Sequence, residues 1–230
     1  MARITLRSSR RQAAMPPASA ELGVSSMTTP EIITAVKDVV LAIAAAVTAI
    51  IAILGLKSWY RELRGRAEFD AARGLARATY RLRDELAACR SPFIRASEFP
   101  SSYQGRDKSS PKEEAEALAH VYKYRWEPVW KAIQEFDAQA LEAESLWGKE
   151  IRTKSDALRD CAKELSVGME AMIDNELSGG RNFESDRNFA KQIRARVSAS
   201  GSDEENPLSR KVAVAVDGIE ALLRPHLKRS

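Results

Sequence analysis

The first candidate for chemistry in this 230-residue chain is a group of carboxylates close to a histidine. Glu113, Glu114 and Glu116 precede His120, and the four-residue spacing from Glu116 to His120 places both on one helical face. A di-iron site in a helical bundle needs Glu-x-x-His pairs on two helices, but the chain has only one other histidine, His226. We therefore expect an ordinary hydrogen bond between Glu116 and His120, and neither a metal site nor a cofactor.

The two cysteines, Cys89 and Cys161, are candidates for a nucleophile or a metal ligand. Two thiols cannot build a disulfide scaffold or a cysteine-based zinc site. Both fall on apolar helical stripes, so we expect them to be buried and reduced. The chain also has no Gly-rich phosphate loop and no HExxH, GxSxG or CxxC motif. We predict no catalytic residue, and an enzyme with an unrecognised site is the least favoured function.

Aromatic side chains gather near Pro128: Tyr122, Tyr124, Trp126, Trp130 and, further along, Trp147. Such a group could form an aromatic cage for a ligand, but it is more often core packing where helices cross. We favour core packing. Because proline lacks an N–H, Pro128 is expected to bend or restart its helix near Trp126.

A fourth set of residues points to a membrane surface: Lys57, Trp59, Tyr60, Arg61, Arg64 and Arg66. Tryptophan and tyrosine favour the headgroup level of a bilayer, and each nearby lysine or arginine gains about 1 kcal/mol from anionic lipid. We predict that these six residues form a membrane interface. Binding to nucleic acid is not expected, because the later arginines lie among acidic residues and no reading element is recognisable.

An apolar segment directly precedes these residues. Residues 39–56 contain no charge and one polar side chain, Thr48. As a helix, 18 residues extend roughly 27 Å, close to the hydrocarbon thickness of a bilayer. A buried soluble helix and a cleaved signal peptide are the alternatives, but the apolar run is longer than a signal core and no small-x-small site follows it. We predict an uncleaved transmembrane helix over residues 32–56, after a disordered extension over residues 1–31.

The distribution of basic residues sets the expected orientation. Ten lysines and arginines lie between Lys57 and Arg95, whereas residues 18–37 contain only Lys37. The positive-inside rule then places the C-terminal part in the cytoplasm, here of a bacterial inner membrane. Residues 1–26 look like an extension upstream of a natural start at Met27, and their arginines from Arg3 to Arg11 could invert the topology if they are retained.

The rest of the chain is predicted to be helical, with its charges in three blocks. Residues 57–96 form a basic juxtamembrane helix that carries an apolar stripe: Leu75, Thr79, Leu82, Leu86, Cys89 and Phe93. Residues 97–111 are expected to form a loop, and residues 178–230 short helices near 186–198 and 207–223, the last closed by Pro225, and a basic tail. The intervening residues 97–180 are acidic, so the outer blocks could fold against them.

Residues 112–177 form a long helical region with a good start at Ser110-Pro111 and acidic residues in the first turn. An apolar residue recurs every three or four positions from Leu118 to Met172. This pattern predicts one long helix after Pro128, and a hairpin that breaks near Gly148–Thr153 is the alternative.

The stretch from Leu56-Lys57-Ser58-Trp59 to Arg90-Ser91-Pro92-Phe93 resembles a set of bacterial single-span membrane proteins without an assigned activity. The resemblance implies an inner-membrane protein and no site. From the residues themselves we expect an all-α chain, with a single N-terminal transmembrane helix followed by an elongated cytoplasmic bundle with a coiled-coil-like character.

The expected function is that of a membrane-anchored structural or interaction protein. Its partners would be the lipid bilayer and a protein, which could be a second copy of the chain. An accessory or signal-transducing subunit of a membrane complex is the alternative.

Overall fold

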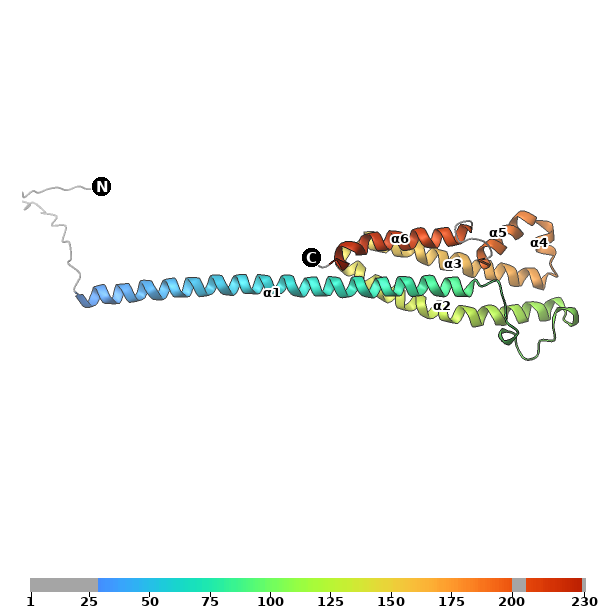
Figure 1. Ribbon diagram of the computed structural model, residues 1–230, viewed down its shortest axis with the longest axis horizontal. Coiled ribbons are helices and arrows are strands. Elements are labelled where there is room, and N and C mark those ends of the chain that lie inside the picture. Colours follow the sequence, from blue (N-terminus) through green and yellow to red (C-terminus); the bar gives the residue numbers. More distant parts are fainter. Residues whose placement is uncertain (1–28, 200–205, 229–230) are drawn as a thin grey trace, which may run out of the picture. The chain divides into compact units, whose positions relative to one another are not determined.

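A computed structural model describes residues 29–199 and 206–228, and within these residues all regular structure is helical. The helices are α1 (Thr29–Cys89), α2 (Pro111–Trp147), α3 (Lys149–Leu177), α4 (Arg181–Ser185), α5 (Arg187–Val197) and α6 (Pro207–Leu227) (Figure 1). Two short 3-10 turns, Ala96–Glu98 and Arg106–Lys108, interrupt the connection between α1 and α2. The prediction of an all-α chain is confirmed for this part of the sequence.

The chain divides into two units, Met1–Lys57 and Ser58–Ser230. In the first unit the described residues all belong to α1, which begins at Thr29. The predicted disordered extension over residues 1–31 therefore ends too late by three residues, and its first 28 residues lie outside the described part. Residues 200–205, between α5 and α6, and residues 229–230 also lie outside it.

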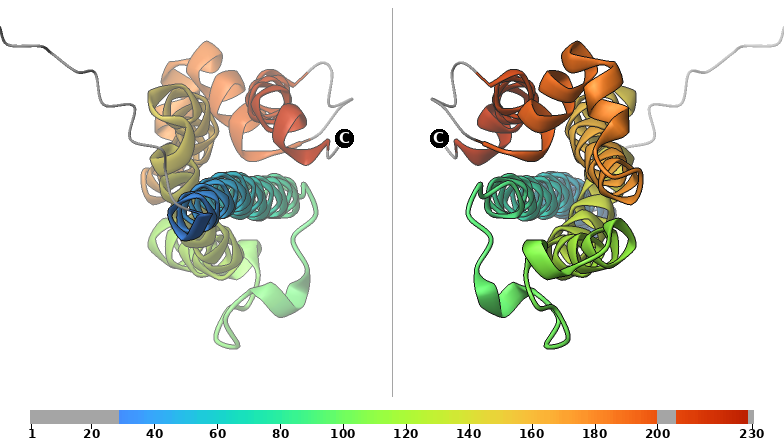
Figure 2. Two further views of the ribbon diagram at one scale, coloured as in Figure 1. Left: turned by 90° about the vertical axis from the view of Figure 1, so that its left-hand side faces the viewer. Right: turned by 90° about the vertical axis from the view of Figure 1, so that its right-hand side faces the viewer.

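The second unit is a bundle in which α2, α3, α6 and the part of α1 after Ser58 surround a common core (Figure 2). Its fully buried large side chains come from every one of these helices, among them Leu82, Phe136, Leu158 and Ile219. Helix α5 packs on α3 and contributes Ile193 to the same core. The amphipathic stripes seen in the sequence are thus buried against one another, as predicted.

The α1 stripe is confirmed except at its end. Leu75, Leu82 and Leu86 are buried, and the small side chains of Ala72 and Ala78 let neighbouring helices approach closely. Phe93, however, is 82% exposed. The prediction failed there because α1 ends at Cys89, so the helical spacing no longer determines which way Phe93 points.

Residues 111–177 form a hairpin of two helices, so the hairpin alternative is confirmed. Helix α2 begins with a capping box, in which Ser110 Oγ accepts from the Glu113 N–H and the Glu113 carboxylate accepts from the Ser110 N–H at 2.7 Å. It ends at Gly148, whose φ of +76° and ψ of −156° lie in a region that essentially only glycine occupies.

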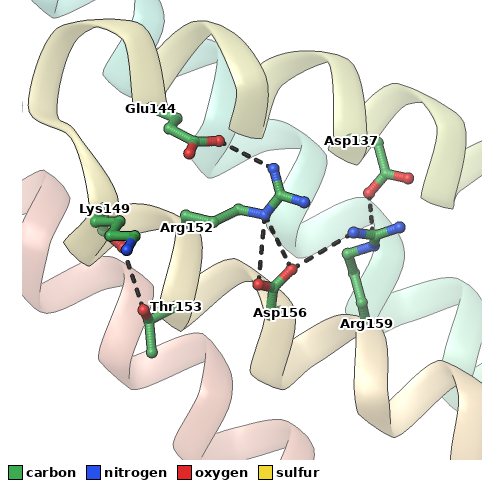
Figure 3. A network of polar contacts seen from close by, with 7 residues as sticks. All are labelled: Asp137, Glu144, Lys149, Arg152, Thr153, Asp156 and Arg159. Atoms are coloured by element: carbon green, nitrogen blue, oxygen red, sulfur yellow. Dashed lines mark hydrogen bonds and ion pairs between the residues drawn. The ribbon is translucent and has the colours of Figure 1, made fainter.

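A ladder of alternating charges runs along the outside of the hairpin (Figure 3). Arg152 lies 3.0 Å from Glu144 and 3.2 Å from Asp156, and Arg159 lies 3.4 Å from Asp156 and 3.0 Å from Asp137. Each side chain is about one-third to one-half exposed, so solvent screens each pair and its contribution to stability is small. The ladder therefore favours the register of α2 on α3 more than it stabilises the hairpin.

The two helix-internal prolines do not end their helices, which corrects the prediction that Pro225 closes the last helix and excludes the predicted restart at Pro128. Pro128 lies inside α2 without a restart, and Pro225 lies inside α6, which continues to Leu227. A proline leaves the carbonyl four residues earlier without its helical donor. Pro128 and Tyr124 are both exposed, so the Tyr124 side of the helix faces solvent that can satisfy that carbonyl.

The outer blocks of the chain fold on the middle block, as the charge pattern allowed. Arg81 of α1 is paired with Glu135 of α2, and Glu164 of α3 is paired with Lys211 of α6 at 2.6 Å and with Arg196 of α5 at 3.1 Å.

A buried arginine, Arg90, joins the end of α1 to α5 and α6. It is 3% exposed and donates to the carbonyls of Arg196 (2.9 Å) and Ala195 (3.3 Å) in the last turn of α5. It also donates to Ser209 Oγ (3.0 Å) and to Oδ1 of Asn206 (2.7 Å), the residue that caps α6. A cation suits this place because the carbonyls at a helix C-terminus carry partial negative charge.

Candidate membrane interface

The apolar segment lies within α1 and is not covered by the described chain. An 18-residue window of α1 has a mean hydropathy of 2.9, and none of that window is buried. Its one polar side chain, Thr48, donates from Oγ1 to the Ala44 carbonyl at 2.8 Å, so the helix satisfies the hydroxyl itself. Among the described residues, helix α1 is long and apolar enough to cross a membrane. A signal sequence near an N-terminus shares this property.

The six predicted interface residues lie on α1 directly after this segment, and all are exposed. Trp59 is 56% exposed and Tyr60 is 70% exposed. Two of the arginines are paired within the helix: Arg64 lies 2.9 Å from Glu68, and Arg66 lies 2.6 Å from Glu62. Among the described residues, Lys57 and Arg61 have no such carboxylate, so they are the two cations most available to an anionic surface.

Glu68 connects this part of α1 to the end of the bundle. The hydrogen bond from Arg64 is the main reason that the pKa of Glu68 lies below its usual value, and His226 of α6 adds to the effect. Because this pKa is lowered, the Glu68 carboxylate is ionised at neutral pH and offsets part of the local positive charge.

The carboxylate and histidine group predicted near residue 116 forms no metal centre. Glu116 lies 3.8 Å from Lys112, and His120 is exposed on the same helix. Both line an open hollow of about 500 Å³ between the N-terminal turns of α2 and the preceding loop, with Tyr103, Lys108 and Glu113. In the described residues no group of three or more histidine, cysteine or acidic side chains has a geometry that could hold a metal ion. The expected hydrogen bond between Glu116 and His120 is not formed.

Both cysteines are buried, as predicted, and neither is bonded to another cysteine. Burial raises the pKa of Cys89 to about 12 and the pKa of Cys161 to about 11. A thiol with so high a pKa is protonated at neutral pH and is a poor nucleophile. Cysteine chemistry at these positions therefore requires a change in their surroundings.

The aromatic residues near Pro128 do not form one cluster, which corrects half of the core-packing prediction. Tyr122 is buried and Trp126 packs on the core, but Tyr124 is 64% exposed and Trp130 is 53% exposed. Trp147 lies at the other end of α2 and stacks on His226, with ring centroids 4.4 Å apart. The prediction failed because residues 122–130 cover more than two turns, so their side chains point to every side of one helix.

The best-enclosed ion pair of the chain's described part joins the loop after α1 to α2. Arg125 Nε donates to Glu98 Oε2 at 2.5 Å, and the guanidinium also donates to the carbonyls of Ser91 (2.7 Å) and Phe93 (2.6 Å). The side chains of Arg125 and Glu98 are 9% and 11% exposed. The sequence signal for this site was a single arginine in phase with an apolar stripe; nothing in it identified Glu98 as the partner.

Comparison of the chain with protein-family models, with curated proteins and with solved structures found no match in any of the three.

Proposed function

We propose that this chain is a single-pass membrane protein whose helical bundle is tethered to the membrane and binds a protein partner there. The observation that carries the proposal is the 18-residue window of α1, which combines a mean hydropathy of 2.9 with no buried residue. A soluble protein rarely leaves so large an apolar surface uncovered, because each Å² exposed to water costs about 25 cal/mol. A bilayer removes this cost, and the interface residues after Leu56 supply the headgroup contacts.

The bundle is placed in the cytoplasm of a bacterial cell, at the inner membrane. Lys57, Arg61, Arg64 and Arg66 follow the apolar segment within ten residues, and cytoplasmic flanks are the ones enriched in such residues. The two buried cysteines form no disulfide with each other, which is compatible with a reducing compartment.

A pair of C-terminal reporters tests the orientation, one enzyme active only inside the cell and the other only outside. The unmodified chain is expected to activate the inside reporter. Changing Lys57, Arg61, Arg64 and Arg66 together to glutamine should reduce the inside signal and raise the outside signal, because these residues supply most of the charge asymmetry. Activity of the outside reporter on the unmodified chain would contradict the proposed orientation.

The surface of α2 is the proposed contact with a protein partner. Trp130 is 53% exposed and Leu141 is 64% exposed, and 11 residues of helix bring both to the same side, three turns apart. Large exposed apolar side chains of this kind are enriched where proteins bind one another, and tryptophan is a frequent anchor. The partner is expected to be either another membrane-complex subunit or a second copy of the chain.

Crosslinking in intact cells tests this contact. A photoreactive amino acid at position 134, between the two apolar residues, should give a defined crosslinked species. The double change Trp130→Ser and Leu141→Ser should abolish it, whereas Val214→Ser, at a 71% exposed position of α6, should leave it unchanged. Equal crosslinking in all three chains would show that α2 is not the contact.

A further inference from the structure

An uncharged stripe runs along the outer surface of α2. Its members recur every three or four residues and are all exposed: Trp130, Gln134, Ala138, Leu141 and Ser145. The stripe extends about 24 Å along the helix. Another helix can therefore pack along the stripe without taking one of its side chains' charges out of water, since it has none.

A hollow of about 390 Å³ opens beside α2 at the level of Trp130. Its lining includes Ala88 and Cys89 of α1 and Tyr124, Pro128 and Lys131 of α2. Its wall contains an aromatic ring, because Tyr124 is 64% exposed. The hollow is larger than an indole ring, so it has room for a tryptophan side chain from another molecule.

Trp130 and the hollow lie on opposite edges of the α2 stripe. Trp130 is two helical turns before Asp137, which forms an ion pair with α3, so Trp130 lies on the edge toward α3. Lys131, which lines the hollow, is one turn before Glu135, which forms an ion pair with α1. The stripe thus has a projecting ring on its α3 edge and a hollow on its α1 edge, at the same level of the helix.

Two copies of this surface fit each other when their α2 helices run parallel. A two-fold axis between parallel helices places the α3 edge of each copy against the α1 edge of the other, so each Trp130 reaches the other copy's hollow. This arrangement also leaves Ser58, the first residue of each bundle, at the same end of the pair. Insertion of two identical anchors into one bilayer requires that placement.

The distribution of charge favours α2 over α6 for contact between identical copies. Near the axis of a parallel pair each residue faces its own copy, so a charged residue faces a like charge. The α2 stripe contains no charged residue. The outer face of α6 has exposed charges at intervals of seven residues, Arg210, Asp217 and Arg224, which a parallel pair would bring against themselves.

We propose that the partner of the α2 stripe is a second copy of this chain, and that each Trp130 enters the hollow between α1 and α2 of the other copy. The inference rests on the proposed membrane anchor, because two chains held in one bilayer meet at a high local concentration. A stripe on one helix is then sufficient, although it is smaller than the interface of a typical stable complex in solution.

Two differently tagged copies in the same cells identify the partner. With a photoreactive amino acid at position 134, close to the two-fold axis, the crosslinked product is expected to include molecules that carry both tags. A product that never carries both tags would overturn the second copy as partner and leave the α2 contact in place. Absence of any product would overturn the α2 contact as well.

Single cysteines test the parallel arrangement in isolated membranes under a mild oxidant, with the unmodified chain as background. Gln134→Cys and Ser145→Cys should each form a disulfide-linked dimer, because a parallel pair brings both positions close to their own copies. Ala221→Cys, at an exposed position of α6, should form it about tenfold more slowly. An antiparallel or head-to-tail pair brings at most one of the two α2 positions next to itself, and that result would overturn the proposal.

Trp130→Ala in the Gln134→Cys chain tests the role of the ring. It should slow dimer formation about tenfold, a typical effect of truncating an aromatic anchor. Tyr124→Ala removes a wall of the hollow and should also slow it, whereas Val214→Ala, at a 71% exposed position of α6, should not. Trp130 and Tyr124 are both more than half exposed, so neither change opens the core. Equal rates in the Trp130→Ala and Val214→Ala chains would overturn the assignment of the ring to the hollow.

Discussion

Arg125 is one of the charged residues whose removal should damage the bundle. Its guanidinium holds Glu98 and the carbonyls of Ser91 and Phe93, and both partners of the ion pair are nearly enclosed. Removing Arg125 takes the donor from two carbonyls and leaves the buried Glu98 carboxylate with the Arg95 N–H alone, which costs about 3 kcal/mol. Arg125→Ala should lower the free energy of unfolding by this amount in urea denaturation.

Lys131 provides the matched control on the same helix. It lies 2.7 Å from Glu127, but both side chains are more than 60% exposed, so Lys131→Ala should leave the free energy of unfolding almost unchanged. Equal losses in the two variants would mean that the loop after α1 is not held by Arg125.

The same pair gives the bundle a dependence on acid. The hydrogen bond from Arg125 is the main reason that the pKa of Glu98 is lowered in the folded chain. The unfolded chain therefore binds this proton more readily, and the stabilisation is present at pH values above about 4.5 and is lost as the pH falls through the folded pKa. Urea denaturation between pH 7 and pH 3 should show this loss in the unmodified chain. Glu98→Gln should be less stable at pH 7 and show a smaller loss; an unchanged pH profile would refute the assignment.

These two residues show what spacing alone can predict. Arg125 falls in phase with Tyr122 and Val129, so the sequence placed it on the inward side of α2. Glu98 lies in a connection of 21 residues between α1 and α2, and the path of such a connection is set by contacts with distant residues rather than by any periodic pattern. The pair could not be found before the fold was known.

At the scale of the elements, the turn between α2 and α3 is the feature that the apolar pattern left open. A glycine inside a helix costs only about 1 kcal/mol, so Gly148 alone was compatible with a continuous helix. The hairpin forms because the stripes of α2 and α3 can then be buried on each other, from Phe136 to Leu158 and Leu165. Burial of several large side chains outweighs the cost of one turn.

A substitution at this turn tests whether its backbone needs glycine. Gly148→Ala should lower the free energy of unfolding by about 1–3 kcal/mol, because a side chain is strained at φ +76° and ψ −156°. The control is Gly218→Ala in α6, where the added methyl group would meet only the flexible Lys154 side chain and helix propensity improves, so stability should stay the same or rise by up to about 1 kcal/mol. An undiminished stability in Gly148→Ala would show that the turn tolerates another backbone conformation.

At the scale of the whole molecule, the apolar segment is both the strongest signal in the sequence and a surface that the described residues leave uncovered. The uncharged run of residues 39–56 needs no tertiary contact to be recognised, because bilayer thickness sets its length. The arrangement of the bundle was only partly predictable: stripes identified inward faces, but the contacts of Arg90 and His226 bring together residues more than 100 positions and more than 150 positions apart, respectively.

The central claim, that α1 anchors the bundle in a membrane, is tested most directly by alkaline carbonate extraction of bacterial membranes containing the full chain with a C-terminal tag. If α1 is a membrane anchor, the full-length protein will stay in the membrane pellet and only detergent will release it. The chain without residues 1–26 should behave in the same way. The double change Ala46→Arg and Ile50→Arg should move the chain out of the pellet, since each arginine at the centre of a span costs about 3 kcal/mol. Full-length unmodified protein in the carbonate supernatant, or a shortened chain that has lost the apolar segment, would contradict it.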